Sequence, residues 1–171
     1  LTAVIRVNRL DEMPEIKPLE GQVTTSDGGT IDVTVSGELP TGGSLSLAEM
    51  DNAAITVEDG EELVVALDIT VLNADGSEWQ PESGDNITIS IPADQLGLSD
   101  GEWFVVYHVY NGNSSKIGPK TVKNGYVTFV VNSFSEFDFA ITEVDYSDSI
   151  GMDAVFNIED GEYGSFMILD E

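Results

Sequence analysis

The sequence predicts an all-β protein, an antiparallel β-sandwich built as two small sandwich subdomains in tandem. Two observations lead to this prediction. Apolar and polar residues alternate over many short segments, a period of two that places every second side chain on the same face of a strand. Clusters of Gly, Asn and Asp separate these segments, as tight turns require. Short, evenly spaced strands with turns between them are typical of sandwiches.

The first half of the chain alternates most clearly around its turns. Pro14 and Pro18 make the segment after the first strand a linker or an edge, because each proline removes a backbone donor. Residues 73–76, Asn-Ala-Asp-Gly, predict a hairpin turn. The predicted strands cover residues 2–9, 30–36, 45–47 and 61–72.

The second half continues in the same style. Residues 103–110 are apolar on both faces, which predicts a central strand covered on both sides. Residues 92–98 hold the one expected helical turn, and Asn124–Gly125 predicts a tight hairpin turn. The predicted strands cover residues 86–91, 103–110, 120–122, 126–131, 137–142, 154–158 and 165–169.

We expect four parts along the chain, of which the boundary at residue 92 is implied by the resemblance described below. Residues 1–20 form an N-terminal strand and a proline-containing linker, and residues 21–92 form the first sandwich. Residues 93–142 form the second β subdomain. Residues 143–171 form an acidic C-terminal segment with a possible hairpin.

The charge balance restricts the partners. Thirty-two acidic residues against six basic ones give a formal net charge of −26, which repels nucleic acid and anionic membrane surfaces. The absence of cysteine excludes disulfides and thiolate chemistry, and no apolar run is long enough for membrane insertion. Because the chain begins at Leu1 without a targeting segment, we expect a mature protein or a piece of a longer one.

Two groups of segments resemble a known kind of module. Their order is similar to that of β-sandwich modules in Gram-positive (Firmicutes-type) cell-surface proteins, and to the tandem ZU5 and UPA domains. In that comparison residues 21–92 are ZU5-like and residues 93–142 are UPA-like. The segments are 67–71, 75–81 and 86–92, followed by 106–110, 125–129 and 133–137.

The resemblance implies a function outside the cell. We expect a non-enzymatic structural or adhesive module of a secreted or cell-wall-attached bacterial protein. Its partners are then an unknown protein or glycan and the other domains of the same surface protein. No cofactor is expected.

Some ZU5–UPA proteins cleave themselves at a His-Phe-Ser sequence, where the serine attacks the preceding carbonyl and the histidine takes its proton. Here the triplet is Ser133-Phe134-Ser135, so the nucleophile is present and the adjacent histidine is not. The single histidine, His108, lies in another predicted strand. We therefore expect no catalytic residue and an uncut chain.

Two alternatives remain. Trp79, Trp103 and Tyr107 are candidate ligand-binding aromatics, which favours an accessory carbohydrate-binding domain of a secreted enzyme. Acidic clusters at 58–62, 145–153 and 159–162 raise the minor alternative of a calcium-stabilised interaction domain. None of them has the alternating Asp spacing of a calcium loop, so no metal ligand is assigned.

Overall fold

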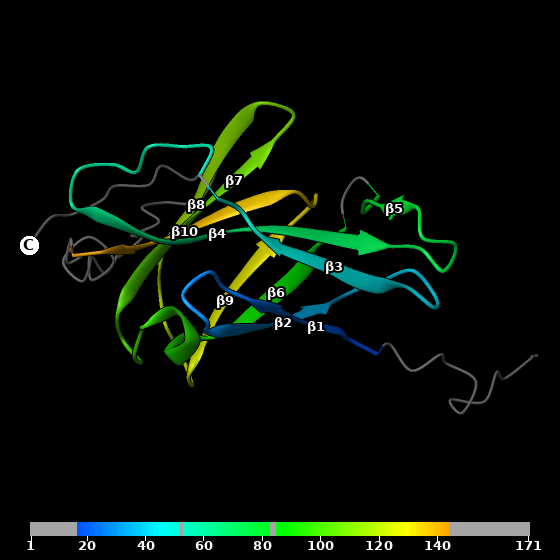
Figure 1. Ribbon diagram of the computed structural model, residues 1–171, viewed down its shortest axis with the longest axis horizontal. Helices are drawn as coiled ribbons and strands as arrows, with labels where there is room; N and C mark the ends of the chain where they lie inside the picture. Colours follow the sequence, from blue (N-terminus) through cyan, green and yellow to red (C-terminus); the bar gives the residue numbers. More distant parts are fainter. Residues whose placement is uncertain (1–16, 52, 83–84, 144–171) are drawn as a thin grey trace, which may run out of the picture.

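The chain folds into two antiparallel sheets in the computed structural model, which describes residues 17–51, 53–82 and 85–143 (Figure 1). This confirms the predicted all-β class. The elements are β1 (Leu19–Thr24), β2 (Thr30–Ser36), β3 (Ser44–Glu49), β4 (Glu61–Leu72), β5 (Glu78–Trp79), β6 (Ile87–Pro92), the 3₁₀ turn η2 (Ala93–Leu96), β7 (Trp103–Tyr110), β8 (Asn113–Thr121), β9 (Tyr126–Val131) and β10 (Glu136–Thr142).

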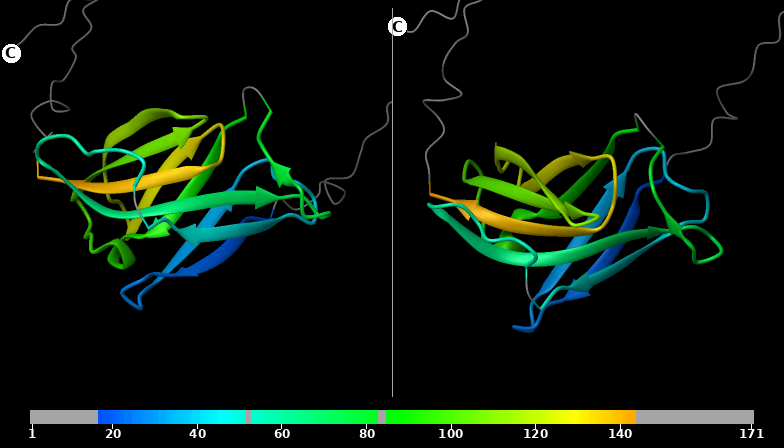
Figure 2. Two further views of the ribbon diagram at one scale, coloured as in Figure 1. Left: turned by 45° about the horizontal axis from the view of Figure 1, so that its top comes forward. Right: turned by 90° about the horizontal axis from the view of Figure 1, so that it is seen from above.

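The two sheets pack face to face around one apolar interior (Figures 1 and 2). One sheet has the order β1-β2-β6-β9, and the other has the order β3-β4-β10-β7-β8, with β5 beside β4. Alternation places every second side chain of β2, β6 and β9 in this interior. The largest fully buried side chains are Phe104, Phe129, Phe137, Leu67, Ile69, Ile87, Ile89, Ile91, Val33, Val35, Val71 and Val105.

The sequence does not predict β1 or β5, and of β8 only residues 120–121 fall in the predicted strand 120–122. β1 alternates weakly and lies at a sheet edge, where it pairs with β2 alone and packs beside β3 of the other sheet. β8 is a polar edge strand that contains the Gly118–Pro119 pair, and it forms through its pairing with β7. Edge strands bury few side chains, so the period-2 pattern is diluted there. The helical turn expected at 92–98 is the short 3₁₀ turn η2, which ends at Gly97 with φ of 71°.

The expected division into tandem subdomains at residue 92 is not confirmed. β9 pairs with β6, and β10 pairs with β4, so strands from both expected subdomains share each sheet. One buried cluster extends from Val23 to Phe139. The described residues therefore form one sandwich with a common core.

The turn at Asn124–Gly125 is present, with φ of 54° and 78°, and backbone hydrogen bonds join Lys123 and Tyr126 across it. It does not close a hairpin, because β8 and β9 belong to different sheets. The turn instead carries the chain from one layer to the other. The strands expected at 2–9, 154–158 and 165–169 lie outside the described residues.

Phe137 tests the shared core. Its ring is fully buried, and its centroid lies 5.7 Å from that of Phe129 in the opposite sheet. We expect Phe137→Ala to lower the free energy of unfolding by about 3–5 kcal/mol, through lost burial and the cavity that remains. Urea unfolding measures this. The matched control is Val130→Ala, at a side chain 46% exposed, which should cost less than about 0.5 kcal/mol.

Candidate functional site

The register between β7 and β10 brings the single histidine beside a serine. Phe137 on β10 lies opposite His108 on β7. Ser135 comes two residues before Phe137, so the alternation of the chain directs its side chain to the same side. The Ser135 Oγ lies 3.1 Å from the His108 Nε2. A hydroxyl and an imidazole from distant parts of the sequence are therefore in hydrogen-bonding contact.

His108 is held in an apolar position. Its side chain is buried, and its ring stacks on Phe137 with centroids 4.4 Å apart and planes at 8°. Burial lowers the pKa of His108, so the imidazole is neutral at neutral pH. A neutral imidazole has one nitrogen that donates and one that accepts, so Nε2 has either role toward Ser135 according to its tautomer.

The Ser135 hydroxyl has a second partner, the backbone carbonyl of Val109, to which it donates in a short hydrogen bond. The hydroxyl has only one proton. In this arrangement Nε2 carries a proton and donates to Oγ. Rotation of the hydroxyl toward His108, with the imidazole in its other tautomer, makes Nε2 the acceptor instead.

The Gln80 side chain forms two hydrogen bonds with the backbone of Phe134. The Phe134 N–H donates to the Gln80 Oε1 at 2.8 Å, and the Gln80 Nε2 donates to the Phe134 carbonyl oxygen at 3.0 Å. Gln80 directly follows the short strand β5, whose Trp79 ring lies 6.1 Å from that of Phe134. The Ser135 carbonyl accepts from the Ile69 N–H at 3.0 Å, so both ends of the residue are anchored.

These four residues have the parts needed for acyl transfer. Ser135 has a nucleophilic hydroxyl, His108 has a neutral nitrogen within reach of it, and Gln80 donates to the carbonyl oxygen of Phe134. A donor at that oxygen stabilises the negative charge that develops when the carbonyl carbon is attacked. From the sequence alone, Ser135 had no neighbouring base, and no role was predicted for Gln80.

The three aromatic residues singled out from the sequence are not gathered into one surface. Tyr107 is buried and its hydroxyl donates to the Glu61 Oε2 at 2.5 Å. Trp79 is half-buried and packs against the main core. Trp103 is half-buried and lines a hollow with Tyr126. Ile55 and Val57 pack against the small buried cluster that contains Tyr107.

Ion pairs occupy part of the first acidic cluster. Lys116 Nζ lies 2.6 Å from the Glu58 Oε2 and 2.7 Å from the Glu61 Oε1. Burial acts to raise the pKa of Glu61, but hydrogen bonds from Lys116 and Tyr107 outweigh it, and the pKa lies below its usual range. In this way Lys116 fastens the segment before β4 to β8.

Asp138 is a buried acid on the outer face of the six-stranded sheet. It lies on β10 opposite Tyr107, and neither carboxyl oxygen has a hydrogen-bond donor in bonding geometry. Burial, then the nearby Glu136 carboxylate, raise the pKa of Asp138 to about 6, although the amides of Ala54 and Ile55 act to lower it. Glu136 itself accepts from the Ala54 N–H at 2.8 Å.

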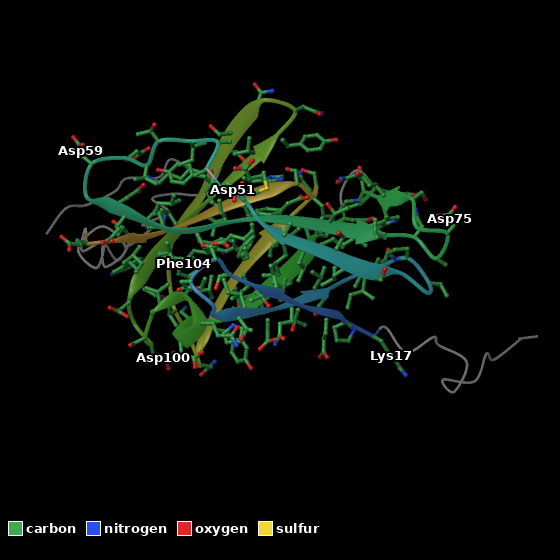
Figure 3. All side chains as sticks on the ribbon, viewed as in Figure 1. Lys17, Asp51, Asp59, Asp75, Asp100 and Phe104 are labelled. Carbon is green, nitrogen blue, oxygen red and sulfur yellow. The ribbon has the colours of Figure 1, made fainter. Side chains whose placement is uncertain are left out.

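Within the ranges that the structure describes, no three His, Asp or Glu side chains are placed to hold a metal ion. Figure 3 shows Asp59, Asp75 and Asp100 at separate points on the periphery of the fold. The acidic segments at 145–153 and 159–162 lie outside the described residues. Asp59, Asp75 and Asp100 are exposed, whereas Asp138 is buried.

Comparison with known proteins adds no identity. No protein-family description, curated protein or solved structure matches the chain. Among the described residues no helix is long and apolar enough to cross a membrane.

Asp138→Asn should stabilise the fold at about pH 7.5 by on the order of 1–2 kcal/mol. The folded state holds the Asp138 proton up to pH about 6, whereas the unfolded chain releases it near 3.8, so stability falls as the pH rises through this window. The amide removes that loss. Chemical unfolding at about pH 4 and pH 7.5 measures it, with exposed Asp51→Asn as the control. Equal effects at both pH values would contradict this interpretation.

Proposed function

We propose that the Phe134–Ser135 peptide bond is a site of self-cleavage by intramolecular acyl transfer. The observation that carries the proposal is the 3.1 Å contact between the Ser135 Oγ and the His108 Nε2. It is supported by the hydrogen bond from Gln80 to the Phe134 carbonyl. The absence of a histidine within the Ser-Phe-Ser triplet had argued against this chemistry, but β7 supplies one from a distance.

The first step exchanges an amide for an ester. The Ser135 Oγ attacks the carbonyl carbon of Phe134 while His108 Nε2 takes the hydroxyl proton, and the oxyanion forms beside the Gln80 amide. The C–N bond then breaks as His108 returns the proton to the Ser135 nitrogen. The product is an ester between Phe134 and the Ser135 Oγ, with a free α-amine at Ser135.

The second step consumes one water molecule. Water attacks the ester carbonyl, the Ser135 Oγ leaves with a proton, and Phe134 ends as a carboxylic acid. The two fragments together weigh one water molecule more than the intact chain. Because the cut precedes β10, which lies between β4 and β7, the second fragment stays bound to the first through the sheet.

Intact-mass spectrometry tests the proposal. Freshly purified protein is incubated at neutral pH, with and without hydroxylamine, which cleaves the ester. We expect fragments that end at Phe134 and begin at Ser135 under denaturing conditions, and one species under native conditions. Ser135→Ala should abolish them, and Ser135→Cys should retain them, because a thiol is also a nucleophile.

Further variants assign the roles of the neighbouring residues. His108→Gln should slow cleavage by about 10²–10⁴-fold, the usual contribution of a general base. Gln80→Leu should slow it by about 10²–10³-fold, as for an oxyanion donor. Ser133→Ala is the matched control, because it removes a hydroxyl two residues before Ser135 while the bond from Ser135 to His108 remains, and it should cleave at the wild-type rate. A chain that stays uncut with hydroxylamine overturns the proposal.

A second candidate function is the one expected from the sequence, a non-enzymatic structural or adhesive module of a secreted or cell-wall-attached bacterial surface protein. The short bond from Ser135 to the Val109 carbonyl favours it, because a hydroxyl proton engaged there makes Ser135 a bridge between β7 and β10. Among the described residues only Asn111 and Asn124 have positive φ outside glycine, so the backbone at Ser135 carries no such strain.

In that second case Ser135→Ala leaves an uncut chain and removes one hydrogen bond, which costs about 1 kcal/mol of stability. The acidic surface and the absence of cysteine agree with an extracellular module that contacts a protein, a glycan or neighbouring domains of its own chain. The two alternatives from the sequence, an accessory carbohydrate-binding domain of a secreted enzyme and a calcium-stabilised interaction domain, stay predictions.

A further inference from the structure

We propose that a hollow between β8 and β9 binds a short acidic oligosaccharide, through the carboxylate of a uronic acid. The hollow has a volume of about 370 Å³, within the range of small-molecule sites. Neither Phe134 nor Ser135 lines this hollow, so the binding proposal does not depend on the proposed self-cleavage. Its lining includes Trp103, Tyr126, Lys120, Lys123, Thr121 and Thr128.

The side chains that line the hollow carry a net positive charge. Two lysines line this hollow, and no Asp or Glu is among its lining residues, in a chain with only six basic residues against 32 acids. Lys116 forms ion pairs with Glu58 and Glu61, whereas neither Lys120 nor Lys123 forms an ion pair with a described carboxylate. Two ammonium groups at the wall of a concave surface favour an anionic ligand.

The surface next to the hollow is acidic. Another hollow, of about 480 Å³, shares Tyr126 but is lined by Glu20 and Asp32 and by no lysine. An anionic group is therefore attracted on the Lys120 and Lys123 side and repelled on the other. The position of the charge in the ligand is thereby set, while a long polyanion is disfavoured by the net charge of −26.

The remaining walls of the hollow combine aromatic rings with hydroxyl groups. Trp103 is half-buried and the Tyr126 side chain is 48% exposed, so both rings offer apolar surface to a ligand. Thr121 and Thr128 place hydroxyl groups beside them. Apolar ring faces together with hydroxyls suit the C–H face and the hydroxyl groups of a pyranose, and the lysines suit its carboxylate.

The backbone around the hollow holds these groups in place. Trp103 lies opposite Thr121 in the β7–β8 register. Lys123 and Tyr126 exchange two backbone hydrogen bonds, of 3.1 and 3.2 Å, across the Asn124–Gly125 turn. The Gly125 N–H donates to the Asp100 carboxylate at 2.6 Å, which ties the turn to the loop before β7. Binding therefore requires little ordering of the backbone.

Tryptophan fluorescence tests the proposal. Trp79→Phe leaves Trp103 as the single tryptophan of the chain, so emission reports on the hollow. The probe is trigalacturonate, and the matched neutral sugar is galactotriose. We expect a saturable change with trigalacturonate and none with galactotriose. Lys120→Gln and Lys123→Gln should each weaken binding by roughly tenfold, because each removes a charge-assisted contact.

Lys17→Gln is the control for net charge, because it removes the same charge at a residue that does not line the hollow. Figure 3 shows Lys17 and Asp100 apart from each other along the lower edge of the fold. This variant should bind as tightly as the parent, and thermal melts should show all variants folded. No saturable change, equal binding of the neutral sugar, or tighter binding of adenosine monophosphate than of trigalacturonate would overturn the proposal.

Discussion

The pairing of β10 with β7 and β4 is the constraint on which most of the structure depends. β10 is an inner strand of the six-stranded sheet, and its register with β7 places Phe137 opposite His108 and Asp138 opposite Tyr107. Alternate side chains of β10 therefore lie in two different environments. Its inner face joins the core that both sheets share, and its outer face lies under residues 53–57. A shift by one residue would exchange these two faces.

Local patterns were sufficient for the strands that bury a full face. Residues 30–36, 61–72, 103–110 and 126–131 alternate or are apolar throughout, and each forms a strand. Of β8 only residues 120–121 were predicted, because an edge strand is formed by pairing more than by burial. Sheet membership was not accessible either. The resemblance divided the chain at residue 92, whereas β9 and β10 pair with strands on the other side of that division.

The candidate site also depends on strand pairing that local sequence patterns do not predict. Ser135 and His108 were both recognised as chemically relevant, but 27 residues separate them and only the β7–β10 register makes them neighbours. Gln80 lies in segment 75–81, which carries part of the resemblance, but that motif gave it no chemical role, because its bonds to Phe134 depend on the tertiary fold. Residue types are visible in a sequence, whereas the contacts that turn them into a site arise from long-range pairing.

If the proposed self-cleavage takes place, the strong negative charge of the chain acts on its balance between amide and ester at Ser135. An acyl shift without water turns a neutral amide nitrogen into an amine that gains a proton, which adds one positive charge in a field of −26. That field favours the ester. Hydrolysis then adds a carboxylate at Phe134, which the same field opposes. Charge alone therefore favours the first step of the proposed reaction and opposes the second, so we expect the proposed ester to persist until a small nucleophile such as hydroxylamine opens it.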